Sequence, residues 1–293
     1  MIRQIVECVP NFSEGHDPRI QKNIADAVVA GGADVLWEEM DPDHNRAVIT
    51  FAGRPRVVAE SAFRAIAAAV ASIDLRRHAG VHPRLGAADV VPLVPLEGVT
   101  MAECVALAHG LGERVWRDLR VPVFFYEAAA RLPERTRLEN VRRGQFEHST
   151  LVPDIGGPSL DPAAGAVIVG ARKLLIAFNI NLTTSDVSIA SQIASKIRAS
   201  SGGLPRVKAM GVFLESRGLA QVSMNLTDFE RTSPKAVFDA VREEAKRLGT
   251  DIRGSELVGL IPRKALEPAG PEYFQFEDFT PDRILENRLA TIE

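Results

Sequence analysis

Apolar positions recur along the chain with the spacings that distinguish strands from helices. In the first half, short apolar runs predict strands over residues 5–10, 35–39, 46–51, 90–94 and 121–126. Helical periodicity or alanine content predicts helices over residues 17–30, 56–73 and 100–119. Asp17 before Pro18, and Thr100 with Glu103, are typical of helix starts. With a polar loop at 11–15 and an irregular, charged excursion at 131–149, the predicted order is β-α-β-β-α-loop-β-α-β.

The pattern restarts at Ile168. Strands are predicted over residues 173–181, 209–214, 221–226 and 256–261. Helices are predicted over 185–198 and 233–248, and a terminal helix over 281–289. The order in this half is β-α-β-β-α-β, which is the same unit as in the first half without the added α-β pair.

The two halves share a pattern of elements although no motif recurs between them. This unit is the split βαβ, or ferredoxin-like, arrangement, in which a sheet carries helices on one face. We therefore predict an α+β protein of two ferredoxin-like subdomains, over residues 1–179 and 180–293.

Composition places the chain among ordinary intracellular globular proteins. Its 293 residues are 46% hydrophobic and 25% charged, and the formal net charge of -3 gives no general attraction to nucleic acid. Cys8 and Cys104 lie in apolar segments and are interpreted as core residues. The N-terminus lacks a signal-peptide pattern, and no apolar run approaches the ~20 residues of a membrane span. We expect a cytoplasmic protein without nucleic-acid or membrane partners.

Four polar clusters interrupt the core pattern: residues 11–16, 41–46, 77–89 and 153–165. Each has a plain structural interpretation, as a helix lead-in, a hairpin turn, a surface turn and a linker. The functional interpretation centres on His82, because an imidazole can accept and return a proton near neutral pH. A neighbouring guanidinium such as Arg84 would suit a carboxylate.

Cofactor chemistry has weak support from spacing. His78 and His82 are four residues apart, but Gly80 and Pro83 argue against a helix there and no third ligand is evident, so no metal is expected. The glycines and prolines of 153–165 do not form a GxGxxG fingerprint, which leaves nucleotide binding unsupported. That segment is either a linker or a loop whose backbone approaches a flat ligand in a cleft between the subdomains.

Several blocks resemble, in colinear order, those of the glutamate formimidoyltransferase family, the formiminotransferase part of formiminotransferase–cyclodeaminase. The blocks are Cys8-Val9-Pro10-Asn11-Phe12-Ser13-Glu14-Gly15, Asn45-Arg46, Gly80-Val81-His82-Pro83-Arg84-Leu85-Gly86-Ala87, Gly170-Ala171-Arg172-Lys173, Ala177-Phe178-Asn179-Ile180-Asn181 and Leu257-Val258-Gly259-Leu260-Ile261-Pro262. The fold that the resemblance implies, two ferredoxin-like subdomains with a folate groove between them, agrees with the pattern of elements.

The resemblance implies transfer of the formimino group from N-formimino-L-glutamate to N5 of tetrahydrofolate, the co-substrate, in histidine degradation and one-carbon metabolism. It implies His82 as the general acid and base, and we expect Asp41 to orient it or to polarise the amidine. Arg46, Arg84, His44 and Asn11 are the candidates for substrate binding. A homodimer is implied as well. The implied folate-binding residues are Gly157, Pro158, Ser159, Leu160, Asp161, Pro162, Ala163, Ala164 and Gly165, with Arg172 and Lys173.

Two departures from the family pattern qualify these expectations. The stretch from 157 to 165 lacks the aromatic residues of the vertebrate folate loop, which bears on pterin stacking. The chain also ends about where the transferase part ends, so we expect cyclisation of the product to need a separate protein. The alternatives are the same fold using 5-formyl-tetrahydrofolate and glutamate, a non-catalytic folate-binding protein, and an amidine hydrolase that turns over without folate.

Overall fold

The computed structural model describes residues 3–80, 82–267 and 269–292. They form two compact units, Met1–Arg172 and Lys173–Glu293, which are considered separately below. The subdomain boundary predicted between residues 179 and 180 lies inside strand β8 (Ile176–Leu182), a few residues beyond this division.

The first unit contains strands β1 to β7, helices α1 to α5 and the short 3-10 helices η1 and η2. Their bounds are β1 Ile5–Cys8, β2 Asn11–Phe12, α1 Pro18–Ala30, β3 Asp34–Asp41, β4 Arg46–Gly53, α2 Pro55–Ser72, η1 Leu75–Arg77, β5 Ala88–Glu97, α3 Met101–Leu119, β6 Val123–Glu127, η2 Pro133–Thr136, α4 Leu138–Val141, α5 Gln145–His148 and β7 Val167–Ala171. The predicted helix starts are confirmed, because Asp17 accepts from the backbone of Arg19 and Thr100 forms a capping box with Glu103.

The strands of this unit form one sheet in the order β3-β4-β1/β2-β5-β7-β6, with β1 and β2 both lying between β4 and β5. The pairs from β3 to β5 are antiparallel, whereas β7 runs parallel to β5 and β6. The α+β class predicted from the sequence is confirmed.

Two segments differ from the predicted elements. Asn11 and Phe12 were expected in a loop but form β2, because their backbone pairs with both β4 and β5 while the Phe12 ring is fully buried. The segment from Ile168 was expected to open the second half but belongs to the first sheet, because β7 pairs with β5 and β6.

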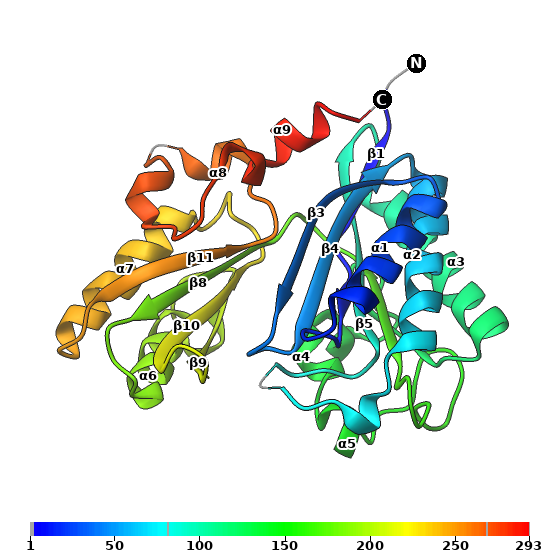
Figure 1. Ribbon diagram of the computed structural model, residues 1–293, viewed down its shortest axis with the longest axis horizontal. Helices are drawn as coiled ribbons and strands as arrows, with labels where there is room; N and C mark the ends of the chain where they lie inside the picture. Colours follow the sequence, from blue (N-terminus) through cyan, green and yellow to red (C-terminus); the bar gives the residue numbers. More distant parts are fainter. Residues whose placement is uncertain (1–2, 81, 268, 293) are drawn as a thin grey trace. The chain divides into compact units, whose positions relative to one another are not determined.

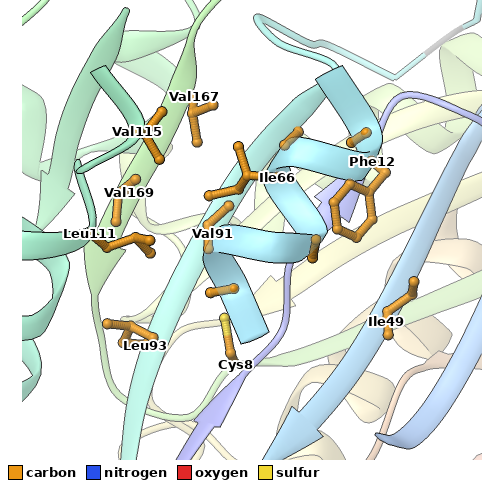
Figure 2. Packing of buried hydrophobic residues seen from close by; sticks show 14 of the residues in the cluster. Cys8, Phe12, Ile49, Ile66, Val91, Leu93, Leu111, Val115, Val167 and Val169 are labelled. Atoms are coloured by element: carbon orange, nitrogen blue, oxygen red, sulfur yellow. The ribbon is translucent and has the colours of Figure 1, made fainter. Parts of the chain in front are cut away.

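The main core of this unit lies between the sheet and helices α1, α2 and α3, which Figure 1 shows on one side of it. Figure 2 shows Val91 next to Ile66 of α2 and Phe12 beside the same helix; all three belong to this core. A smaller cluster, with Phe124 and Val141 among its members, lies on the opposite face and brings α4 against β6. Residues that alternate with core residues along a strand therefore point to that second face.

The second unit is built from β8, α6, β9, β10, α7 and β11, the predicted β-α-β-β-α-β order. Its bounds are β8 Ile176–Leu182, α6 Val187–Ile197, η3 Ala199–Ser201, β9 Val207–Leu214, β10 Leu219–Leu226, α7 Pro234–Arg247, β11 Ile252–Val258, α8 Arg263–Leu266, η4 Pro271–Phe274, η5 Pro281–Arg283 and α9 Leu285–Leu289. The terminal helix predicted over 281–289 is divided into η5 and α9.

The sheet of the second unit is antiparallel, with the order β11-β8-β10-β9. This order matches β5-β1-β4-β3 in the first unit, so the repeat of pattern corresponds to a repeat of topology. Helix α6 packs on β9 and β10, α7 packs on β8 and α6, and an apolar core fills the space between them and the sheet.

Candidate functional site

A polar cluster lies on the face of the first sheet that points away from α1, α2 and α3. Arg46, Asn11 and Asp89 each neighbour a core residue in a strand, respectively Ala47, Phe12 and Ala88. Because neighbouring residues of a strand point to opposite faces, Arg46 and Asn11 share the second face. Asp89 lies at a register shift of β5, between Ala88 and Val90, and its ion pairs with Arg46 and Arg142 place it in the same group. The pairing of β2 with both β4 and β5 then brings them together.

Arg46 connects the members of this cluster. Its Nε donates to Asn11 Oδ1 at 2.7 Å, and its Nη1 lies 3.2 Å from Asp89 Oδ2 and 2.8 Å from His82 Nδ1. Its side chain is only 12% exposed. Burial and the nearby Arg142 lower the pKa of Arg46 to about 9, although Asp89 opposes them.

Asp89 is fully buried and is shared by two guanidinium groups. Its Oδ2 accepts from Arg46 and from Arg142, and its Oδ1 accepts from the Leu85 backbone at 2.7 Å. One carboxylate thus faces two guanidinium groups, which leaves the three side chains with a net charge of +1 when all are ionised. The cluster is therefore a buried cationic spot beside His82.

His82 is partly buried next to this spot. Burial, followed by the charges of Arg46 and Arg142, holds the pKa of His82 well below its ordinary value. The imidazole is consequently uncharged near neutral pH, the state in which it can accept a proton. Its Nδ1 also lies 2.8 Å from the carbonyl oxygen of Pro83.

Asp41, which is predicted to orient His82 or to polarise the amidine, contacts His44. Its carboxylate accepts from the His44 backbone at 2.9 Å and lies 2.8 Å from His44 Nδ1. Burial acts to raise the pKa of Asp41, but the hydrogen bonds from His44 outweigh it and lower that pKa. The His44 ring lies edge-on to the His82 ring, with 6.1 Å between centroids. The three side chains therefore lie in the sequence Asp41, His44, His82.

The loop that carries His82 is anchored on the β3–β4 hairpin, at the same end of the first unit in Figure 1. His78 Nε2 lies 2.9 Å from the Asn45 carbonyl oxygen, and the Asn45 amide donates to the Ala79 carbonyl at 2.7 Å. A Cβ on Gly80 would lie 2.8 Å from the Asn45 Cβ, so this close approach requires glycine. Val81, in the same sequence block, lies outside the described residues.

Arg84 joins the loop that carries His82 to the charged segment 131–149. Its side chain is buried, and its Nη2 donates to Glu147 Oε1 at 2.6 Å and to the His78 carbonyl at 3.1 Å. The Phe146 backbone donates in turn to the Arg84 carbonyl. The two arginines proposed for substrate binding therefore occupy different environments, and Arg46 is the one beside His82.

The N-terminal cluster supports the same loop through its backbone. Ser13 donates from its hydroxyl to the Gly86 carbonyl at 2.8 Å and from its backbone to the Ala87 carbonyl at 2.9 Å. The Gly15 backbone donates to Asn45 Oδ1 at 2.8 Å. This cluster thus fixes the end of the His82 loop and the hairpin together.

The stretch from 157 to 165 lies beside the other end of the His82 loop. Asp161 Oδ1 accepts from the backbone of Ala163 and Ala164, and the Ala164 carbonyl accepts from the Ala87 backbone. Gly165 has a φ of +72°, and a Cβ there would lie 2.0 Å from the Leu85 carbonyl oxygen. The first part of the stretch, residues 157–159, is exposed.

Arg172 and Lys173 lie at the other end of β7 from Gly165. Strand β7 separates Arg172 from Gly165, and a strand rise of about 3.3 Å per residue puts them roughly 20 Å apart. Arg172 lies near the buried Glu7, whose pKa burial raises to about 7 while Arg172 opposes that rise. Lys173 pairs with Asp228 at 2.8 Å.

Three contributors to the site were not assigned from the sequence. Asp89 is the last residue of the polar cluster 77–89 and was given no role; an acid directly before an apolar strand is the sequence signal for it. Arg142 and Glu147 lie in the charged excursion, where no local pattern distinguishes them from solvated residues.

Among the described residues, no group of three or more histidine, cysteine, aspartate or glutamate side chains is placed to hold a metal ion. The helices within the described ranges are all too short or too polar to cross a membrane.

The chain matches two family models, the N-terminal subdomain of the formiminotransferase domain over residues 5–172 and the formiminotransferase domain over residues 177–287. A glutamate formimidoyltransferase of Streptococcus pyogenes is 43% identical over 295 residues, covering 98% of this chain and 99% of that protein. One of Thermoplasma acidophilum is 44% identical over 295 residues, covering 97% of each. The formimidoyltransferase-cyclodeaminase of Rattus norvegicus is 42% identical over 307 residues, covering 98% of this chain and 57% of that protein. The chain therefore belongs to the formiminotransferase domain family.

Proposed function

We propose that this protein transfers the formimino group from N-formimino-L-glutamate to N5 of tetrahydrofolate, giving 5-formimino-tetrahydrofolate and L-glutamate. The names of two curated relatives, both glutamate formimidoyltransferases, support this reaction. The observation that carries it is the uncharged imidazole of His82 beside the cationic cluster of Arg46, Asp89 and Arg142. That arrangement offers a proton acceptor and a positive charge at one place.

His82 would manage the proton in this reaction. A bond forms between N5 and the amidine carbon, and the bond between that carbon and the glutamate nitrogen breaks. N5 loses a proton, and the glutamate nitrogen gains one. An imidazole that starts uncharged can take the first proton and supply the second, so one side chain serves both steps. The low pKa of His82 favours return of the proton to the leaving nitrogen.

Arg46 is the proposed ligand for a substrate carboxylate. Within the described part of the chain, its Nη2 has no hydrogen-bond partner, whereas Nε and Nη1 are engaged by Asn11, Asp89 and His82. A carboxylate bound at Nη2 would lie next to the imidazole. Arg84 pairs with Glu147 and also donates to the His78 carbonyl, so we assign it the role of positioning the loop that carries His82. Asp41 would act on His82 through His44, which it holds in place.

The stretch from Gly157 to Gly165 is proposed to contact folate, because its second half is joined to the end of the His82 loop by backbone hydrogen bonds. The exposed residues 157–159 leave backbone groups accessible to a ligand. Arg172 and Lys173 would suit the anionic glutamate tail. A ligand that reached both Gly165 and Arg172 would have to extend roughly 20 Å along β7.

The ferredoxin-like class, the boundary at 179, the cytoplasmic location and the homodimer stay predictions.

An assay of the purified protein with N-formimino-L-glutamate, with and without tetrahydrofolate, tests this function. We expect 5-formimino-tetrahydrofolate and glutamate in equal amounts, and neither product without folate. Release of glutamate without folate would identify an amidine hydrolase instead. Turnover of 5-formyl-tetrahydrofolate with glutamate, but none of the formimino donor, would assign the alternative donor. Folate binding without turnover of either donor would indicate a binding protein.

A further inference from the structure

The Nδ1 atom of His82 has two neighbours that require opposite protonation states of that nitrogen. Arg46 Nη1, which can only donate, lies 2.8 Å away, and the Pro83 carbonyl oxygen, which can only accept, also lies 2.8 Å away. An uncharged imidazole carries one proton on its two nitrogens. Nδ1 can therefore satisfy one neighbour at a time.

The two choices correspond to two tautomers. When Nδ1 accepts from Arg46, the proton is on Nε2, and that nitrogen is an acid. When Nδ1 donates to Pro83, Nε2 has a free lone pair and is a base. The step that begins the proposed reaction needs a base.

We propose that Arg46 sets the tautomer of His82, and that a substrate carboxylate bound to Arg46 moves the imidazole proton from Nε2 to Nδ1. This inference rests on the proposed function, because that function supplies the carboxylate. In the free protein Arg46 holds Nδ1 as an acceptor. Bound substrate removes that donor, the proton transfers to Nδ1 by exchange with solvent, and Nε2 becomes the base. Arg46 is thus a positioning residue for His82 as well as a substrate ligand.

The contacts of Arg46 explain why its hydrogen bond to His82 is the one that is lost when a carboxylate binds. Nε is held by Asn11, so a carboxylate that binds with two hydrogen bonds has to use Nη1 and Nη2. The two hydrogens of Nη1 already serve Asp89 and His82. The charged guanidinium is attracted more strongly to the negative charge of a carboxylate than to a neutral imidazole. The neutral imidazole is the weakest acceptor of the three, and it loses its donor.

Asp89 stays in place when the Arg46 side chain turns toward a bound carboxylate. Its two oxygens are held by the Leu85 backbone and by Arg142, and the carboxylate is fully buried. Pro83 is also adjacent to His82 in the chain, so its carbonyl stays within reach of Nδ1 after Arg46 turns. The acceptor for the new Nδ1 proton is therefore already in place.

Nitrogen NMR of the full chain, labelled with ¹⁵N at histidine, measures this tautomer directly. The His82 signals are assigned by their loss in His82→Gln. In the free protein near pH 7.5, we expect Nδ1 of His82 to be of the unprotonated type. L-Glutamate, added at concentrations that inhibit formimino transfer, should shift Nδ1 to the protonated type. His109, whose Nε2 lies 2.9 Å from the Ala129 carbonyl, is the internal control and should not change.

A second variant separates the tautomer from folding. Arg46→Met removes the donor that faces Nδ1, and we expect it to show the protonated Nδ1 with or without glutamate. The same variant should raise KM as well as lower kcat. If it does not fold, the titration of the natural chain with glutamate still decides the matter.

The same Nδ1 state with and without inhibiting glutamate would overturn the inference. Formimino transfer with such an unchanged tautomer would leave the proposed function intact and remove only the coupling to Arg46. A tautomer shift on glutamate binding in a protein that performs no transfer would do the reverse, because the coupling would stand and the function would not.

Discussion

Replacement of Asp89 by asparagine tests the charge arrangement on which the site depends. Asp89→Asn keeps the size of the side chain and one oxygen able to accept from the Leu85 backbone. It removes the negative charge shared by Arg46 and Arg142, which are 12% and 11% exposed. The net charge of the group then rises from +1 to +2 in a buried position.

The expected loss in the free energy of unfolding is about 3–5 kcal/mol, the range found when one partner of a buried ion pair is removed. Urea unfolding of the natural chain and the variant, followed by circular dichroism, measures it. The double variant Asp89→Asn/Arg142→Gln returns the net charge to +1. Its loss should therefore be smaller than the sum of the two single losses by about 0.5–3 kcal/mol, the coupling expected for contacting residues. A loss below about 1 kcal/mol for Asp89→Asn, or additive single losses, would refute the reasoning.

Three further predictions follow from the same site. Because Arg142 helps to lower the pKa of His82, Arg142→Gln should raise that pKa and move the acid limb of the kcat/KM profile to higher pH; an unmoved limb would contradict the electrostatic argument. Gly165→Ala should destabilise the protein by at least about 2 kcal/mol more than Gly202→Ala in thermal unfolding, since both glycines have positive φ but only the new Cβ at 165 meets backbone atoms. Equal losses would show that the contact relaxes. Ser13→Ala should lower the free energy of unfolding by about 1 kcal/mol through loss of its buried hydrogen bond, and no loss would mean that water replaces it.

Local patterns in the sequence predicted most of the elements because their causes are local. The helix that begins at Met101 has its capping box in four consecutive residues, and the hairpin of β9 and β10 follows from two apolar runs around a turn. The β-α-β-β-α-β order followed from these elements. The family blocks predicted His82 and Arg46 as site residues, and the structure brings these two side chains together.

The features that were missed depend on contacts between distant segments. Asn11 and Phe12 are too few to show an alternating pattern, and only β4 and β5 on either side make them a strand. The place of β7 in the first sheet is likewise set by its parallel partners. Asp41 was expected to orient His82 or to polarise the amidine; its carboxylate contacts His44, three residues along the hairpin, and its role stays a prediction.

Arg142 illustrates the limit for the site itself. It lies in a segment whose many charges are typical of a solvated surface, and only the folded chain brings its guanidinium to the buried Asp89. Only the structure shows that Arg142 is a second arginine near His82. Its charge helps to explain why that imidazole stays uncharged.

The most direct test of the central claim is the rate of formimino transfer by His82→Ala, measured together with its affinity for tetrahydrofolate. His148→Ala, which changes an exposed histidine, is the control. If His82 is the general acid and base, kcat should fall by about 10²–10⁴ while folate still binds and the control keeps its rate. Transfer at an undiminished rate by a folded His82→Ala protein would contradict the account.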